Sequence, residues 1–188
     1  ERLRERCPAS RATIVTDDHV GPRYADRAQA SLRAGGFDSA VLTVPAGDAT
    51  KSLEQAAGLF DSLADRRHSR DEPIVALGGG MVGDLAGFVA ATWLRGVPFV
   101  QCPTTVEADV DASVGGKTAV NHSSGKNLIG AFHQPILVCI DTECLMTLER
   151  RDFRAGLAES VKHAVIRDPG FFEWQESNVE AIHAQQPD

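Results

Sequence analysis

Residues that could do chemistry are concentrated between Gly78 and Lys162. Glycines that allow tight turns, lysines with a fixed positive charge and isolated carboxylates recur there at short intervals, where a plain core would carry Leu or Val. Cations of this kind suit a phosphate group, and turn glycines beside a helix suit the pyrophosphate of a nucleotide. The segment therefore predicts a site that holds a charged, phosphorylated small molecule next to a cofactor.

The glycine triplet at 78–80 follows an apolar run and precedes a stretch rich in Ala and Gly. Gly79 and Gly80 would let the backbone approach a pyrophosphate, and the following helix would supply free N–H groups. The spacing differs from the usual dinucleotide fingerprint, so a simple tight turn remains an equal alternative. Asp84 would either stabilise the helix dipole or hold a ribose.

Cations lie within and before a glycine-rich stretch. Lys117 and Lys126 lie nine residues apart, Asn127 adjoins the second lysine, and Arg95 comes before the stretch. Lys is a point charge that suits phosphate, so the group predicts a phosphate site, although each Lys alone could be a solvated surface residue. Gly-Gly-Lys-Thr resembles the end of a Walker A loop, but Asp111 stands where the first glycine would be needed, which excludes that ATPase motif.

Glu159 and Lys162 are three residues apart in a helical pattern and share a helix face. Small and apolar residues surround them, so the carboxylate needs either an ion-pair partner or a metal. An exposed ion pair is the simpler alternative. His122 and His163 are further candidate ligands, but neither has a recognised metal-site spacing from Glu159.

Composition limits the class of protein. The 188 residues carry a net charge of −7, which argues against nucleic-acid binding, and no apolar run approaches a membrane span. The four cysteines have neither zinc-site nor disulfide-framework spacing, which favours a reducing, cytoplasmic compartment.

Strand-like and helix-like segments alternate along the first half of the chain. Strands are expected at 12–17, 40–44, 73–77 and 98–102, with helices at 24–34, 52–66 and 84–94 between them. This order predicts a Rossmann-like α/β domain with a parallel sheet, whose ligands bind at the carboxyl ends of the strands. Asp17, Asp48 and Lys51 fall at that edge, where a turn or helix cap is the simpler role for each.

The second half is expected to differ. Residues 104–135 are rich in Gly, Asn, Ser, Lys and Thr and read as a long loop, which in a compact domain is usually functional. A strand is expected at 136–141, and helices at 152–165 and 169–184. The predicted domains are an α/β unit at 1–148 and, at 149–188, the first helices of an incomplete helical domain.

Five ordered motifs resemble the 3-dehydroquinate synthase family of sugar phosphate cyclases. They are Gly-Gly-Gly-Met-Val-Gly-Asp-Leu-Ala-Gly-Phe at 78–88, Leu-Arg-Gly-Val at 94–97, Val-Asp-Ala-Ser-Val-Gly-Gly-Lys-Thr-Ala-Val-Asn-His at 110–122, Gly-Lys-Asn-Leu-Ile-Gly-Ala-Phe at 125–132 and Gly-Leu-Ala-Glu at 156–159. An ordered series of this kind is far more specific than any one of its members.

The resemblance implies an enzyme that uses NAD and a divalent metal, Zn²⁺ or Co²⁺. Its substrate would be 3-deoxy-D-arabino-heptulosonate 7-phosphate, a phosphorylated sugar acid of the shikimate pathway, which supplies aromatic amino acids. Transient oxidation by NAD would acidify a neighbouring C–H, so that phosphate leaves by β-elimination. Re-reduction and an intramolecular aldol step would then give 3-dehydroquinate. The lyase would act as a homodimer.

The resemblance also assigns roles to residues. The NAD contacts would be Asp17, His19, Asp48, Lys51, Gly79, Gly80, Asp84, Thr104, Thr105, Lys126 and the stretch from Cys144 to Thr147. The substrate contacts would be Arg95, Asp111, Lys117, Asn127 and Lys162, with Asp111, Lys117 and Lys162 catalytic and Arg95 acting across a dimer interface. Glu159 would be one metal ligand, and the family's two ligand histidines would lie beyond residue 188.

The sequence departs from the family at Glu107 and Asp109, which add negative charge near the nicotinamide pocket. Three alternatives stay open. One is another sugar phosphate cyclase, and a second is a glycerol-1-phosphate or iron-type alcohol dehydrogenase. The third is a chain that only binds NAD, because the 188 residues alone are expected to be inactive.

Overall fold

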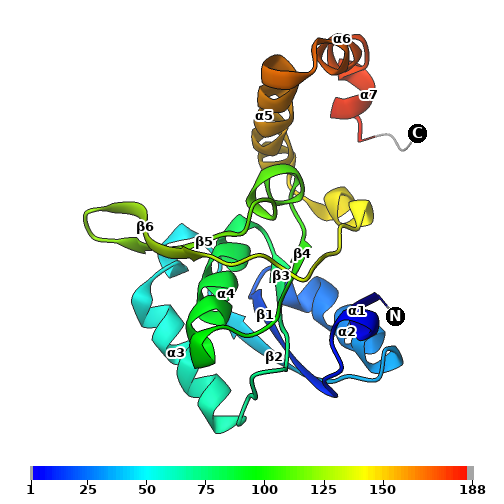
Figure 1. Ribbon diagram of the computed structural model, residues 1–188. Coiled ribbons are helices and arrows are strands. Elements are labelled where there is room, and N and C mark those ends of the chain that lie inside the picture. The colour runs from blue at the N-terminus through cyan, green and yellow to red at the C-terminus, as the bar shows by residue number, and fades with distance from the viewer. Residues whose placement is uncertain (1, 186–188) are drawn as a thin grey trace.

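A five-stranded parallel sheet forms the centre of the computed structural model, which describes residues 2–185 (Figure 1). The strand order is β2-β1-β3-β4-β7 and every neighbouring pair is parallel. The strands are β1 (Arg11–Asp17), β2 (Asp38–Val44), β3 (Ile74–Gly78), β4 (Phe99–Pro103) and β7 (Leu137–Val138). The predicted α/β class is confirmed, whereas the strand expected at 136–141 is only two residues long.

Helices cover both faces of the sheet. They are α1 (Arg2–Arg6), α2 (Gly21–Ala34), α3 (Leu53–Asp65) and α4 (Gly80–Thr92), with short 3-10 helices η1 (Asp48–Thr50) and η2 (Trp93–Arg95). Alternate residues of β3 pack against the helices on opposite faces of the sheet. Ile74 packs with α3 and α4, and Val75 packs with α1 and α2. Apolar residues on both faces of each strand are what a parallel sheet between two helical layers requires.

Helix α4 lies unusually close to its neighbours because it carries glycines on its packed side. A Cβ at Gly83 would stand 2.7 Å from the side-chain oxygen of Gln101, and one at Gly87 would stand 2.5 Å from the Thr118 methyl group. The helix begins at Gly80 rather than at the predicted Asp84. The glycines therefore set the helix tightly against β4 and the segment that crosses it.

The predicted loop at 104–135 is instead largely ordered structure. It contains η3 (Ala108–Ala112), a turn of π-helix, and an antiparallel hairpin of β5 (Lys117–His122) and β6 (Gly125–Phe132). The hairpin lies across α4, and only Thr118 and Val120 of β5 are buried. A two-stranded ribbon with so few buried residues gives little apolar alternation, so its composition resembled a loop.

The remaining described chain is helical. After η4 (Thr142–Thr147) come α5 (Arg150–Arg167), α6 (Pro169–Ser177) and α7 (Val179–His183), which extend away from the sheet (Figure 1). Val165, Ile166 and Trp174 are exposed on α5 and α6. The helical character expected after residue 148 is present through His183, residues 186–188 lie outside the described chain, and the domain boundary stays a prediction. No helix in residues 2–185 is long and apolar enough to cross a membrane.

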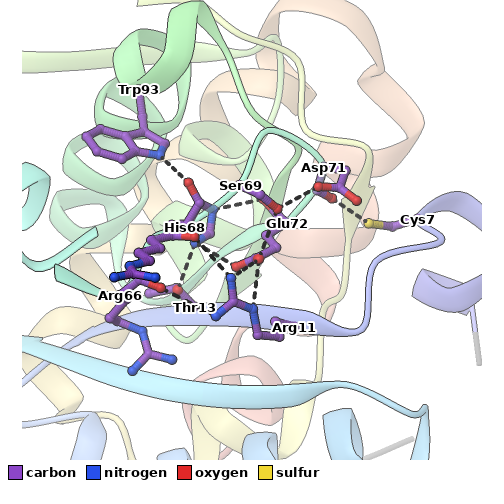
Figure 2. A network of polar contacts seen from close by, with 10 residues as sticks. Cys7, Arg11, Thr13, Arg66, His68, Ser69, Asp71, Glu72 and Trp93 are labelled. Carbon is purple, nitrogen blue, oxygen red and sulfur yellow. Dashed lines mark hydrogen bonds and ion pairs between the residues drawn. The ribbon is translucent and has the colours of Figure 1, made fainter. Parts of the chain in front are cut away.

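A polar network closes the edge of the sheet where β1 and β3 begin (Figure 2). Arg11 donates to Glu72 through two nitrogens, at 2.9 and 2.6 Å. The ring of His68 lies 3.1 Å from the Thr13 hydroxyl and 3.0 Å from the Glu72 carbonyl, while Trp93 donates to the His68 carbonyl. This network fixes the connection from α3 to β3 at the edge opposite the glycine triplet.

Candidate active site

The carboxyl edge of the sheet brings together the predicted cofactor residues of three strands. Asp17 ends β1, Gly78 ends β3, and the Thr104 N–H donates to the Gly78 carbonyl at 3.1 Å. Gly79 is the N-cap of α4, and within residues 2–185 no side-chain hydrogen bond caps that helix. The first N–H groups of α4 therefore remain available to an anion, which fits the pyrophosphate role expected for Gly79 and Gly80.

Two other predicted cofactor residues are occupied by internal hydrogen bonds. One carboxylate oxygen of Asp17 accepts from the backbone N–H groups of His19 and Val20, at 2.9 and 2.8 Å. This is the turn-forming role that the sequence left open as the simpler alternative. The Thr147 hydroxyl hydrogen-bonds to Tyr24 and, at 3.1 Å, to the Cys144 carbonyl. The predicted ribose and cofactor contacts of these residues stay predictions.

Lys51 and Asp84 form an ion pair inside the domain. Lys51 Nζ lies 2.8 Å from Asp84 Oδ2, and the two side chains are 7% and 18% exposed. Burial raises the pKa of Asp84, and the hydrogen bond from Lys51 opposes that rise. Charged side chains are rarely buried without a partner, and such pairs recur at functional sites.

A second group of polar residues ties the hairpin to the turn after β2. Lys126 lies 2.9 Å from Asp48 and lowers the pKa of Asp48 through that hydrogen bond. Asn121 donates to the Asp48 carbonyl and carboxylate at 3.2 and 3.3 Å, and it accepts from the Asn127 N–H at 3.0 Å. No sequence pattern indicated a role for Asn121, because its partner Asp48 lies 73 residues away.

A third, larger group forms where α5 meets η3 and β5. Lys117 lies 3.3 Å from Asp111, Lys162 lies 3.7 Å from the same carboxylate, and Lys162 also pairs with Glu159. The Glu159 hydrogen bond raises the pKa of Lys162. Side chains from three separate segments therefore meet at one place, and their role as a substrate site stays a prediction.

The same group contains donors that could hold a metal ion. Ligand atoms of Asp111, Glu159 and His163 all lie within 4.8 Å of one another. Two carboxylates and an imidazole are a donor set suited to Zn²⁺ or Co²⁺. His163 was noted as a candidate without a recognised spacing from Glu159, and it is the packing of α5 on η3 that brings Asp111 to both.

The predicted phosphate residues do not gather in one place. Lys117 pairs with Phe132 in the hairpin register. The Asn127 N–H instead donates to Asn121, which lies four residues after Lys117 along β5. Four residues of strand span about 13 Å. Arg95 precedes β4 and so lies at the opposite edge of the sheet from Pro103. In residues 2–185 no hydrogen bond or ion pair joins Lys117, Asn127 and Arg95.

The two extra acids of the segment differ in their surroundings. Glu107 is exposed, whereas Asp109 is partly buried and its Oδ1 has no hydrogen-bond partner in the described chain. Burial raises the pKa of Asp109 to about 6. Near neutral pH, Asp109 therefore carries less than a full negative charge on average.

Comparison with known proteins identifies the family. The model of the 3-dehydroquinate synthase N-terminal domain matches residues 41–155. A 3-dehydroquinate synthase of Desulforamulus reducens is 54% identical over 96% of this chain and 50% of its own length. One of Symbiobacterium thermophilum is 54% identical over 94% of this chain and 49% of its own length. The chain belongs to the 3-dehydroquinate synthase family.

Solved structures agree with this family membership. A 2-epi-5-epi-valiolone synthase of Streptomyces hygroscopicus subsp. jinggangensis 5008, with NAD⁺ and Zn²⁺ bound, matches with a TM-score of 0.91 and 31% identity over 98% of this chain and 52% of its own. A 2-deoxy-scyllo-inosose synthase complexed with carbaglucose-6-phosphate, NAD⁺ and Co²⁺ matches with a TM-score of 0.77 and 31% identity over 82% of this chain and 42% of its own.

The 3-dehydroquinate synthase family members that match are about twice as long as this chain, which spans about half of their length. An iron-containing alcohol dehydrogenase from Thermotoga maritima is 16% identical, with a TM-score of 0.69, and shares the fold alone. The dehydrogenase alternative therefore gains no functional support from this likeness.

Proposed function

We propose that this chain is part of a 3-dehydroquinate synthase, an NAD-dependent lyase that converts 3-deoxy-D-arabino-heptulosonate 7-phosphate to 3-dehydroquinate and phosphate. One observation carries the proposal. Asp111, Lys117, Glu159 and Lys162 form one charged group in a chain that is 54% identical, over 96% of its length, to a 3-dehydroquinate synthase. The substrate, reaction and partners of the whole protein are part of this proposal.

NAD would bind along the carboxyl edge of the sheet. The uncapped N-terminus of α4, after Gly79, would receive the pyrophosphate, and Thr104 and Thr105 would border the nicotinamide end. Gly79 is a fitting residue there, because a Cβ would lie 3.1 Å from the Thr105 methyl group. When bound, NAD supplies reversible hydride transfer, which makes the neighbouring C–H of the substrate acidic. Lys51 and Asp84 would hold the ribose side through their buried ion pair.

A divalent metal would bind at Glu159. The donor atoms of Asp111 and His163 complete a group that fits Zn²⁺ or Co²⁺, the ions present in the related cyclase structures. When bound, the metal supplies a positive charge that orients substrate hydroxyls and polarises them. In this arrangement, the Lys162 ammonium that now pairs with Glu159 would become free to donate to the substrate.

The side chains around this centre would each have a distinct role. Lys117 would hold the phosphate of the substrate as a point charge, and Lys162 would donate to a substrate hydroxyl. Asp111 accepts from Lys117 and forms an ion pair with Lys162 in the structure, and it would keep the two ammonium groups oriented. Together they would fix the leaving phosphate beside the C–H bond that breaks, which is the geometric requirement for elimination.

Arg95 would complete the phosphate site of a second subunit. It lies at the opposite edge of the sheet from the charged group, which supports the expected contribution across a homodimer interface. The positive φ of Arg95, 68°, presents the residue on a tight connection before β4.

Four free cysteines support the proposed reducing, cytoplasmic compartment.

A second candidate function is another sugar phosphate cyclase, such as one acting on sedoheptulose 7-phosphate. The TM-score of 0.91 to a 2-epi-5-epi-valiolone synthase favours it, because the fold and most of the charged residues could be shared. Identity separates the two candidates, since that synthase is 31% identical and the 3-dehydroquinate synthase of Desulforamulus reducens is 54% identical.

The test is phosphate release by the full-length protein in the presence of NAD⁺ and Zn²⁺ or Co²⁺. We expect release from the heptulosonate phosphate and none from sedoheptulose 7-phosphate. Lys117→Met and Lys162→Met should each lower kcat/KM by at least about 100-fold, because each removes a positive side chain that would stabilise the transition state. Arg33→Met, an exposed change on α2, is the matched control. Release from sedoheptulose 7-phosphate alone would instead establish the second candidate.

A further inference from the structure

Two cysteines face each other across the last pair of strands in the sheet. Val100 pairs with Leu137 and Gln101 with Val138, so Cys102 and Cys139 come next in the same parallel register. The Cys139 N–H continues this ladder by donating to the Gln101 carbonyl at 2.8 Å. Residues at one register position of adjacent strands point to the same face. The two thiols therefore lie on the same side of the sheet.

The distance between adjacent strands suits a bond between these thiols. Neighbouring strands lie about 4.8 Å apart, and a disulfide needs Cα atoms about 4.4–6.8 Å apart. Cys102 packs with Leu137 beside α2, on the face away from α4. The spacing of the two strands is thus compatible with a bond between the two sulfurs.

Both thiols line a cavity of about 560 Å³ between α2 and the edge of the sheet. Cys139 is exposed and Cys102 is partly buried, so a small reagent reaches Cys139 first. Cys144 lines the same cavity, together with Tyr24 and Asp141. Cys7 is different, because it is 2% exposed and its thiol donates to the Asp71 carbonyl at 3.2 Å.

The two thiols are also unequal in their readiness to ionise. The hydrogen bond from Cys102 lowers the pKa of Cys139 to about 6, although burial opposes this shift. The same interaction, together with burial, raises the pKa of Cys102. Thiolates are the reactive form of cysteine. Cys139 is therefore the nucleophile of the pair and Cys102 the thiol that keeps its proton.

We propose that Cys102 and Cys139 form an oxidation site, at which a hydroperoxide joins β4 to the end of β7 through a disulfide. The Cys139 thiolate attacks one peroxide oxygen, the O–O bond breaks, and the leaving hydroxide takes a proton to become water. Cys102 then attacks the sulfenic sulfur of Cys139, and its proton leaves with the hydroxyl group as a second water. Two thiols and one H₂O₂ give one disulfide and two waters.

This inference does not rest on the proposed function. Neither Cys102 nor Cys139 belongs to the residues assigned to NAD, the metal or the substrate. The link would fasten the outer strand β7, which is only two residues long and, among the described strands, pairs with β4 alone. A thiol reductant would reverse the reaction and release that edge of the sheet.

The experiment maps thiols in the full-length protein after treatment with H₂O₂. Free thiols are blocked with iodoacetamide, the protein is digested without reductant, and the peptide masses are measured by mass spectrometry. We expect a peptide pair joined through Cys102 and Cys139 that disappears after dithiothreitol. Before oxidation, Cys139 should react with iodoacetamide near pH 7 about tenfold faster than Cys102, because only Cys139 is largely thiolate there.

Single variants separate the two steps. Cys102→Ser should leave Cys139 as a sulfenic acid that dimedone traps, whereas Cys139→Ser should leave Cys102 reduced. Cys7→Ser is the matched control and should leave the cross-link unchanged. A link from Cys139 to Cys144, a link only between molecules, or no link in the wild-type protein would each overturn the proposal. The wild-type measurement decides even where a variant folds poorly.

Discussion

Lys51 Nζ lies 2.8 Å from Asp84 Oδ2, and this contact joins the turn after β2 to the first turns of α4. Both residues lie near the uncapped end of α4 that follows the glycine triplet. Taken separately in the sequence, Lys51 read as a solvated turn residue and Asp84 as a dipole partner. Their burial as a pair is what makes this edge of the sheet an organised polar site.

Lys51→Met should destabilise the protein by about 3 kcal/mol, because it leaves the buried Asp84 carboxylate without its partner. The free energy of unfolding is measured by urea denaturation near pH 7.5. Adding Asp84→Leu to Lys51→Met should recover much of the loss, since no uncompensated charge then remains. If the double variant lost the sum of the two single changes, the pairing would not carry the effect.

Gly156→Ala should destabilise the protein although Ala favours helices. A Cβ at Gly156 would stand 2.6 Å from the Glu107 backbone nitrogen and 2.7 Å from the Val106 side chain, where α5 packs beside η3. We expect a loss of roughly 1–3 kcal/mol in thermal or urea unfolding. The same contact positions Glu159 and Lys162 beside Asp111, so their charged group should separate as well.

Gly58→Ala in α3 is the matched control for Gly156→Ala. Gly58 is exposed, and a Cβ there would meet nothing within 4 Å. Replacing it should stabilise the protein by about 0.5–1 kcal/mol through helix propensity and chain entropy. Equal effects at the two glycines would mean that the contact of α5 with η3 is unimportant.

Apolar runs and helix caps in the sequence predicted those strands and helices that are determined by neighbouring residues. The apolar runs at 73–77 and 98–102 became β3 and β4 nearly residue for residue, and Ser52 caps α3 by accepting from the Gln55 N–H. The hairpin was missed because few of its residues are buried, so its strands show no regular alternation of apolar and polar residues. What holds it is contact with α4, and the approach of Gly87 to Thr118 joins positions far apart in sequence.

The sequence indicated several residues that meet in the structure, but it did not indicate how they are arranged. Asp111, Lys117, Glu159 and Lys162 do meet, as the motifs implied. The distance between Lys117 and Asn127 depends on the register of a hairpin that the sequence did not reveal. Asn121 was missed for a related reason, since its hydrogen bonds join β5 to a turn that lies far away in sequence.

Asn121→Ala should loosen the hairpin without unfolding the domain. The change removes the acceptor of the Asn127 N–H and the donor to Asp48, which are separate hydrogen bonds of about 1 kcal/mol each. A loss of about 1 kcal/mol corresponds to about a fivefold change in an equilibrium. Hydrogen exchange of the Asn127 amide should therefore become about fivefold faster for each of these hydrogen bonds that protects the amide and is lost. Ser123→Ala, at the exposed tip, should change little. Unchanged exchange in Asn121→Ala would show that the backbone ladder alone holds the hairpin.

The His68 ring should make stability depend on pH (Figure 2). Its side chain is fully buried, and burial lowers the pKa of His68 below the usual 6.5 although Glu72 opposes the shift. A neutral ring satisfies both of its contacts, by donating to the Glu72 carbonyl and accepting from the Thr13 hydroxyl. Below about pH 6.5, His68 binds a proton in the unfolded chain but stays neutral in the folded protein. The free energy of unfolding should therefore fall as pH falls. His68→Gln should be less stable at neutral pH and flatter between about pH 7.5 and 5 in urea titrations. An equally steep slope in His68→Gln would assign the pH dependence to other groups.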